Sequence, residues 1–590
     1  MAWDVVIRGG TVVDGSGGEP FAADVALSGD RIAAVGVVPE QGRREIDARG
    51  ALVTPGFVDL HTHYDGQVSW DPDLMPSSVH GVTTAVMGSC GVGFAPVRPP
   101  DRERLIALME GVEDIPGTAL SEGIDWRWES FPEYLDALER QPRTIDVAAQ
   151  VTHDPLRVFV MGERAVHDQP ATPEDIAAMR GLLRGALDAG AIGFSTGRTD
   201  NHRSNTGAHT PAANARREEL AGLGAAFRGA GHGVLQAVSD FDMLSGPDGF
   251  DGEFDLLEAM AEAAGRPLSI SLMQRDQEPG QWRRVLRRVE DANARGLDLR
   301  VQVAPRAIGV MLGLDATFHP FMGFPSYRAI AALPLGERVA RLREPAFKER
   351  LLAEKHERLA GDGSAIPPLA DLLLAQLEQL AFRMFVLGAE PDYEPPVTAS
   401  IGARARGAGV PVLAALYDAL LEDDGHALVY FPIHNYCGMN LEAVREMLVH
   451  PAALPGLSDG GAHVATICDA SFPTFLLQHW GRDRPSGRLS VERVVQMQSA
   501  DTAGFLGLQD RGRLVPGLRA DVNVIDLGRL RLRPPRLVRD LPAGGKRLLQ
   551  RAEGVVATLV AGRVIVEGGA LTGERPGRLV RSRPREITVG

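Results

Sequence analysis

The chain is poor in cysteine and has no long apolar segment. Its 590 residues include only three cysteines, too few for a disulfide framework. No apolar run reaches the roughly 18 residues that a membrane-spanning helix needs, and the N-terminus lacks the basic and apolar regions of a signal peptide. These absences predict a cytoplasmic protein that has no membrane partner.

Positive charge is also scarce relative to negative charge. The formal net charge is −15, and no basic stripe offsets it. Nucleic acids and anionic membranes bind basic surfaces, so neither is expected as a partner. Only three of the 62 basic residues are lysines, and the first of them is Lys348.

The length and the 44% hydrophobic content predict a large core and more than one domain. Strand-like segments with glycine turns occur at both ends of the chain. They are residues 4–14, 24–27, 31–36, 521–526 and 555–565. We therefore expect one small β-sandwich domain that is formed from both termini, 1–54 and 510–590.

Between the two ends, short apolar strands alternate with helical stretches, a pattern typical of a βα barrel. The candidate strands are 83–87, 145–151, 191–194, 233–238, 268–272, 298–303 and 427–431. A helix is expected over 173–189. The pattern predicts an α/β protein with a TIM (β/α)8 barrel over 55–509, and the long gap at about 304–425 predicts a helical insertion.

Two histidines follow the first strand of this region. The apolar residues Val53, Phe57 and Leu60 predict a buried strand that ends at His61 and His63. Alternate residues of a strand point to the same side, so the two imidazoles are expected to lie together. That arrangement suits two ligands of one metal ion; the alternative is a pair of histidines in a loop.

The segment Thr-Pro-Gly-Phe-Val-Asp-Leu-His-Thr-His at 54–63 resembles the first-strand signature of the amidohydrolase superfamily. Other motifs resemble its N-acyl-D-amino-acid deacylase (D-aminoacylase) branch. They lie at 87–96, 125–134, 188–197, 301–306 and 457–463. The resemblance covers nearly the whole chain. It implies a metal-dependent hydrolase on a TIM barrel, with the metal at the C-terminal ends of the strands.

The same resemblance implies which residues bind the metal. His61, His63, the cysteine after the second strand (Cys90) and the late aspartate (Asp459) match ligands of the branch. From the residues alone, Cys90 is either a ligand or a small buried apolar residue. Zinc is the expected ion, although another divalent metal would suit the same donors.

Two further ligands of the branch are missing. The histidines expected after the fifth and sixth strands are replaced by residues near Val238 and Leu272, whose aliphatic side chains cannot bind a metal. A carboxylated lysine, the other known bridge, is not available before Lys348. One ion is therefore favoured over two.

Two residues late in the chain are expected to carry the chemistry. By analogy with the superfamily, Asp459 would take a proton from the attacking water and pass it to the leaving amine. The alternative is a turn residue in the Asp-Gly-Gly sequence. His463 is expected to hydrogen-bond the reacting water, to orient Asp459, or merely to begin a helix.

Recognition of a substrate carboxylate is predicted for polar residues near the barrel strands. The branch places a cationic residue next to the sixth-strand position, and Gln274 and Arg275 fall there. Arg198 and Arg306 are the other candidates, since arginine binds carboxylates through two parallel hydrogen bonds. For each arginine the alternative is a structural ion pair.

Three function classes remain open. The first is a deacylase that cleaves the amide C–N bond of an N-acyl-(D-)amino acid or a related amide. The second is an enzyme of the same fold that acts on a lactone, an ester or a cyclic amide. The third is a pseudoenzyme with a degenerate metal site. The expected partner is a small-molecule amide substrate, and a homo-oligomer is possible.

Overall fold

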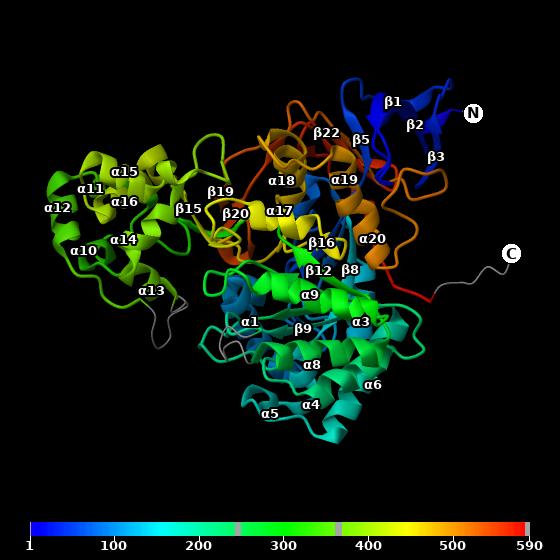
Figure 1. Cartoon of the computed structure of the whole chain (residues 1–590), viewed down its shortest axis with the longest axis horizontal. Helices are drawn as coiled ribbons and strands as arrows, with labels where there is room; N and C mark the ends of the chain where they lie inside the picture. Colours follow the sequence, from blue (N-terminus) through cyan, green and yellow to red (C-terminus); the bar gives the residue numbers. More distant parts are fainter. Residues whose placement is uncertain (1, 242–248, 360–368, 585–590) are drawn as a thin grey trace.

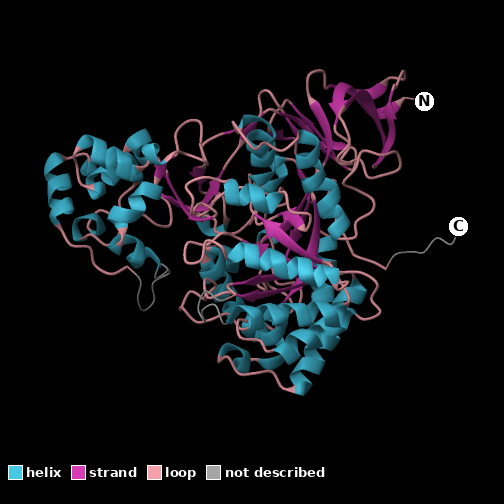
Figure 2. Ribbon diagram, viewed as in Figure 1, coloured by secondary structure: helices cyan, strands magenta, loops and turns pink. Residues whose placement is uncertain are grey.

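The computed structural model describes residues 2–241, 249–359 and 369–584 (Figure 1). Parts of the predicted insertion (360–368) and of the predicted C-terminal domain (585–590) lie outside the described residues. Figure 2 shows strands enclosed by helices in the central body, with further strands near the N-terminus. Within the described ranges, no helix is both long and apolar enough to cross a membrane.

The central body is a barrel of parallel strands, as predicted. Each strand pairs in parallel with its neighbour along the chain. The strands are β6 (Phe57–Thr62), β7 (Val82–Met87), β8 (Asp146–Thr152), β9 (Gly193–Arg198), β10 (Val234–Ser239), β11 (Leu268–Leu272), β12 (Leu299–Val303) and β16 (Ala453–Pro455). A parallel bridge between Thr62 and Gly460 joins the two ends of this series, which confirms the TIM-barrel prediction.

Helices between the strands cover the barrel (Figure 1). The main ones are α1 (Arg102–Glu113), α3 (Phe131–Glu139), α4 (His153–Met161), α6 (Pro173–Ala189), α7 (Arg217–Gly224), α8 (Gly249–Ala264) and α9 (Gln281–Ala294). Helix α6 has the bounds expected from the sequence. Thr172 and Asp175 form a capping box at its start, and Gly190 ends it in the left-handed conformation at φ 109°.

The eighth barrel strand differs from the expectation. The segment predicted at 427–431 is β15 (Val429–His434), which pairs with β13 (Ile308–Leu312) and β14 (Phe385–Val386) outside the barrel. The barrel strand is instead the three-residue β16, which is too short to show a periodic pattern. The insertion between the seventh and eighth strands therefore extends to residue 452 rather than about 425.

The insertion contains a helical lobe, which Figure 1 shows to one side of the barrel. Its helices are α10 (Pro325–Arg328), α11 (Leu335–Leu342), α12 (Pro345–Ala353), α13 (Leu369–Ala375), α14 (Leu377–Leu380), α15 (Ile401–Ala408) and α16 (Val412–Leu420). They enclose their own core, to which Phe321, Leu351 and Leu416 belong. A last helix, α17 (Glu442–Leu448), precedes β16.

Strands from both ends of the chain share one nine-stranded sheet. The N-terminal strands are β1 (Trp3–Val12), β2 (Phe21–Ser28), β3 (Arg31–Gly36), β4 (Gly42–Asp47) and β5 (Leu52–Pro55). The C-terminal strands are β17 (Val522–Ile525), β22 (Val555–Val560), β23 (Arg563–Glu567) and β24 (Ala570–Leu571). The two groups meet where β5 pairs antiparallel with β17.

Not all of the C-terminal region belongs to this sheet. Leu579 forms a bridge with Val147 of β8, so the last described residues run along the barrel. Two short two-stranded sheets also lie outside it. One pairs β18 (Arg531–Leu532) with β21 (Ala552–Glu553), and the other pairs β19 (Arg536–Val538) with β20 (Arg547–Leu549). The described residues 510–584 are thus divided between the nine-stranded sheet, the two-stranded sheets and the barrel surface.

Candidate metal centre

Two histidines and one cysteine converge at the C-terminal end of β6. His61 and His63 are each 1% exposed, and their ring centroids lie 5.4 Å apart. Cys90, in the loop after β7, places its Sγ 3.2 Å from Nε2 of His61. One ligand atom from each of the three residues lies within 4.8 Å of the others. This spacing is compact enough for a single ion.

Asp459 reaches the same place because its segment closes the barrel. Its backbone N–H donates to the carbonyl of His61 at 3.2 Å, and the carbonyl of Gly460 accepts from the N–H of His63 at 2.8 Å. This pairing puts Oδ1 of Asp459 3.3 Å from Nε2 of His61 and 3.9 Å from Nε2 of His63. The structure therefore brings together all four residues predicted as ligands.

Three residues at this centre have backbone angles that side chains other than glycine rarely adopt. The φ angles are 56° at Cys90, 49° at Asp459 and 48° at His463. Such conformations cost on the order of 1–3 kcal/mol each and cluster at functional sites. At Gly91, whose φ is 80°, a Cβ atom would lie 2.6 Å from the backbone nitrogen of Gly197, so only glycine lets this loop approach β9.

Glutamines inside the barrel hold His61. Oε1 of Gln302 lies 2.8 Å from Nδ1 of His61, and Nε2 of Gln302 donates to Ser269. Nε2 of Gln236, an amide donor, lies 3.0 Å from the same Nδ1, and Oε1 of Gln236 accepts a hydrogen bond from Gln150. The three glutamines come from alternate strands of the barrel, β8, β10 and β12, which contribute to one interior layer. Nε2 of His61 faces Cys90 and Asp459, and a metal bound there would leave Nδ1 protonated, the form in which it donates to Gln302.

The sequence interpretation did not identify Glu113, a buried carboxylate at the end of α1. Glu113 is 1% exposed, and its Oε1 lies 3.1 Å from Nδ1 of His63. Its Oε2 lies 3.6 Å from Nε2 of His463. Burial raises the pKa of Glu113 well above its usual value, and the nearby carboxylates of Asp459 and Asp65 raise it further. The spacing along α1 indicates that Glu113 is buried, because Glu113 lies on the same helix face as the buried residues Met109 and Val112.

His202, also missed, lies in the loop after β9. Burial lowers its pKa to about 3, and the fields of His463 and His61 act in the same direction. Its Nδ1 is buried and has no hydrogen-bond partner among the described residues. No sequence motif identifies His202 as a residue of the site, because it lies in a loop that only the tertiary fold brings to the barrel.

The ionisation states at the centre suit a divalent cation. Burial lowers the pKa of His61 and, more strongly, that of His63, so both imidazoles are neutral, the form that binds metals. Burial raises the pKa of the Cys90 thiol well above its usual value, and a bound cation favours the thiolate instead. Within the described chain, Oδ1 of Asp459, which lies near Nε2 of both histidines, is buried without a hydrogen bond. Nitrogen, sulfur and carboxylate donors of this kind fit zinc.

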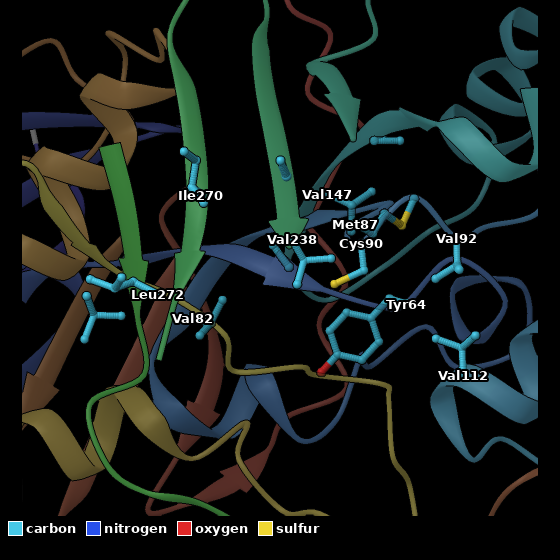
Figure 3. Packing of buried hydrophobic residues seen from close by; sticks show 14 of the residues in the cluster. Tyr64, Val82, Met87, Cys90, Val92, Val112, Val147, Val238, Ile270 and Leu272 are labelled. Atoms are coloured by element: carbon cyan, nitrogen blue, oxygen red, sulfur yellow. The ribbon is translucent and has the colours of Figure 1, made fainter. Parts of the chain in front are cut away.

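Aliphatic side chains stand where two more histidines are expected. Figure 3 shows Val238 beside Cys90 at the end of β10, and Leu272 at the end of β11. Both are buried, at 6% and 1% exposure. Neither position offers a ligand atom, in agreement with the sequence.

Two of the residues predicted to bind substrate lie after β11. Oε1 of Gln274 accepts a hydrogen bond from the backbone of Cys437 at 3.2 Å. The guanidinium of Arg275 is buried and donates to the carbonyls of Ser239 and Asp240 at 2.8 and 3.0 Å. Arg275 also pairs with Asp240 at 3.7 Å, so it too has the structural ion pair of the alternative interpretation, and its binding of substrate stays a prediction.

The other two predicted residues take part in ion pairs. Arg198, the last residue of β9, binds both carboxylate oxygens of Glu253 at 2.6 and 3.0 Å. Arg306 is fully buried and pairs with Asp469 at 3.0 Å. These contacts correspond to the structural alternative, so substrate binding by Arg198 and Arg306 stays a prediction.

The chain was compared with known families and proteins. The model of the amidohydrolase family matches residues 44–566. D-aminoacylase of Alcaligenes xylosoxydans xylosoxydans is 28% identical over 98% of this chain and 97% of its own length. N-acyl-D-glutamate deacylase of the same organism is 32% identical over 51% of this chain and 57% of its own.

A solved structure is similar over the whole chain. A D-aminoacylase mutant in complex with copper chloride superposes with a TM-score of 0.63 at 26% identity, covering 98% of this chain and all of the other. A second structure of D-aminoacylase, with the same TM-score, identity and coverage, concerns the role of that enzyme's binuclear metal centre.

The protein belongs to the amidohydrolase family. Within that family it belongs to the D-aminoacylase-like branch. It is a hydrolase that acts on carbon–nitrogen bonds other than peptide bonds.

Proposed function

We propose that this protein is a metal-dependent deacylase that hydrolyses the amide bond of an N-acyl-D-amino acid or a closely related amide. The convergence of His61, His63, Cys90 and Asp459 at the end of the barrel carries this proposal. The similarity to D-aminoacylase over nearly the whole chain supports the amide and the D configuration. The partial match to N-acyl-D-glutamate deacylase supports the same class of substrate.

We further propose one high-occupancy divalent ion, zinc, held by His61, His63 and Asp459 with Cys90 as the fourth ligand. The copper complex of a D-aminoacylase mutant supports a divalent metal in this branch of the family. D-aminoacylase has a binuclear centre, but Val238 and Leu272 give this chain fewer donors. The proposed count follows from that loss.

The residues of the chain then have separate tasks. A divalent ion in the centre supplies Lewis-acid chemistry, which acidifies water and polarises a carbonyl. Asp459 takes the proton from the attacking water and delivers it to the nitrogen of the leaving amine. His463, with 23% of its side chain exposed, is accessible from solvent and orients the reacting water. Gln274 and Arg275 follow β11 at the same edge of the barrel and are the proposed contacts for the substrate carboxylate.

The experiment that tests this proposal measures metal content and hydrolysis together. Protein purified without added zinc is analysed for metals and assayed against N-acyl-D- and N-acyl-L-amino acids, esters and lactones. The double variant His61→Ala/His63→Ala is expected to lose both metal and activity. A control, His167→Ala/His426→Ala, removes two exposed histidines and is expected to keep both.

The other function classes predict different results. Hydrolysis of esters or lactones without amide hydrolysis would replace the deacylase proposal by the second class. Wild-type protein that binds no metal and hydrolyses none of these compounds would identify a pseudoenzyme, the class that the residues Val238 and Leu272 favour. Metal content that does not change in the double variant would contradict the proposed site.

A further inference from the structure

Glu113 is not one of the four proposed metal ligands, but its side chain is buried within the candidate metal centre. It ends helix α1, and its side chain is 1% exposed. Neither of its carboxylate oxygens has a hydrogen bond within the described part of the chain. Burying a carboxylate without hydrogen-bond partners costs free energy. A functional role of Glu113 at the metal centre would account for this cost.

The two oxygens of Glu113 face two different histidines. Oε1 lies 3.1 Å from Nδ1 of His63, within hydrogen-bond range although the angle is not that of a hydrogen bond. Oε2 lies 3.6 Å from Nε2 of His463. The backbone N–H of His463 also donates to the carbonyl of Glu113. Glu113 therefore ties the loop that carries His463 to the ring of His63.

Glu113 and Asp459 approach different ring nitrogens of His63. Nε2 of His63 is the nitrogen near Asp459, at 3.9 Å, whereas Glu113 approaches Nδ1. A histidine that binds a metal through one nitrogen generally donates its other ring N–H to a carboxylate, a carbonyl or water. His61 uses the neutral amide of Gln302 in this way, and Glu113 is placed to do the same for His63.

We propose that Glu113 is a positioning residue of the metal centre, which orients His63 through Nδ1 and holds His463 at the opposite oxygen. This inference rests on the proposed function, because it requires a metal ion at His61 and His63. It goes further by assigning the carboxylate that aligns His63 and His463. Its chemical consequence is tighter metal binding and a fixed place for His463 beside the reacting water.

The test measures zinc affinity, by competition with a chelator, in wild-type protein and in Glu113→Gln and Glu113→Ala. The control is Glu103→Gln, which changes an exposed glutamate in the first turn of the same helix. We expect about 10-fold weaker zinc binding for Glu113→Gln and up to about 100-fold for Glu113→Ala, the range found for such outer partners. The control is expected to match the wild type. At saturating zinc, kcat should fall in both Glu113 variants while KM changes less than about twofold, because the substrate does not contact Glu113.

Three results would overturn the inference. Wild-type zinc affinity in Glu113→Gln and Glu113→Ala would show that the carboxylate does not position His63. Loss of one oxygen ligand from the X-ray absorption spectrum of the zinc-loaded Glu113→Gln protein would make Glu113 a ligand instead. Unfolding of the isosteric Glu113→Gln variant, detected by circular dichroism, would assign Glu113 a role in folding. Failure of the wild-type protein to bind zinc would instead contradict the proposed function itself.

Discussion

Oε1 of Gln302 lies 2.8 Å from Nδ1 of His61, while Nε2 of the same ring faces Cys90. The orientation of the amide is fixed because its Nε2 donates to Ser269 at 2.9 Å. A metal bound at Nε2 of His61, which lies 3.2 Å from Sγ of Cys90, would leave Nδ1 protonated, and Oε1 of Gln302 is placed to accept its hydrogen bond. A residue on the seventh strand thus controls a ligand on the first.

Replacing Gln302 tests this control directly. In Gln302→Leu the acceptor for Nδ1–H is lost, so His61 is expected to bind zinc about 10- to 100-fold more weakly. Chelator competition measures the affinity. Gln302→Glu keeps an acceptor oxygen in the same position and is the matched control, expected to bind more tightly than the leucine variant. Equal affinity in Gln302→Leu and the wild type would show that Gln302 only fills space.

Asp459→Asn separates catalysis from structure. Asparagine has the same size but cannot accept the proton of the attacking water, so kcat should fall at least ~10²-fold. Because Asp459 is also a proposed ligand, the assay is run with metal and substrate at saturation. Steady-state kinetics of both proteins give the comparison. A near wild-type kcat under these conditions would reduce Asp459 to the turn residue of the alternative interpretation.

The regular elements of the barrel could be predicted from the sequence. Helix α6 has capping residues at both ends, so its bounds of 173–189 could be inferred without the structure. β16 could not, because three residues carry no periodicity and the pairing that defines it is with β12. The longer β15 has the composition of a buried strand whether it lies in the barrel or in the insertion.

The site was predictable where local spacing or a family motif fixes it. His61 and His63 share a strand end, so their proximity follows from strand geometry. Cys90 and Asp459 followed from motifs. Glu113 and His202 come from a helix end and a loop, and only the closed barrel brings them to the centre. Long-range contacts of this kind have no counterpart in sequence spacing.

The metal count follows from the replaced histidines, and anomalous diffraction at the zinc edge can measure it. We expect one high-occupancy ion, because Val238 and Leu272 offer no ligand atom. If Cys90 is a ligand, it binds as the thiolate, with Zn–S near 2.3 Å. Cys90→Ser should then lower metal retention during dialysis, whereas Cys437→Ser, at the partly exposed cysteine, should not. Two fully occupied ions close together would contradict this prediction and require other donors.

An ion pair outside the centre gives a pH-dependent contribution to stability. Glu394 accepts from Arg484 at 2.9 and 3.0 Å and lies 2.8 Å from Nε2 of His479. Burial alone would raise the pKa of Glu394, but the hydrogen bonds from His479 and Arg484 outweigh that effect and lower the pKa to about 2. The ionised carboxylate also accepts from the backbone of Leu441, just before α17.

Because the pKa of Glu394 is depressed on folding, its stabilising effect is present above the unfolded value of 4.5 and is lost as the pH falls toward 2. The full contribution is at most about 3.5 kcal/mol, since one pKa unit corresponds to about 1.4 kcal/mol and the pKa falls from 4.5 to about 2. Glu394→Gln should therefore lower the Tm at pH 7, and the difference from wild type should shrink between pH 4.5 and pH 2. Thermal unfolding followed by circular dichroism measures both.

Glu290→Gln, which removes an exposed partner of His450, is the control and should change the Tm little at any pH. A Tm difference for Glu394→Gln that stays constant across this pH range would mean that packing, rather than the charge of Glu394, stabilises this region.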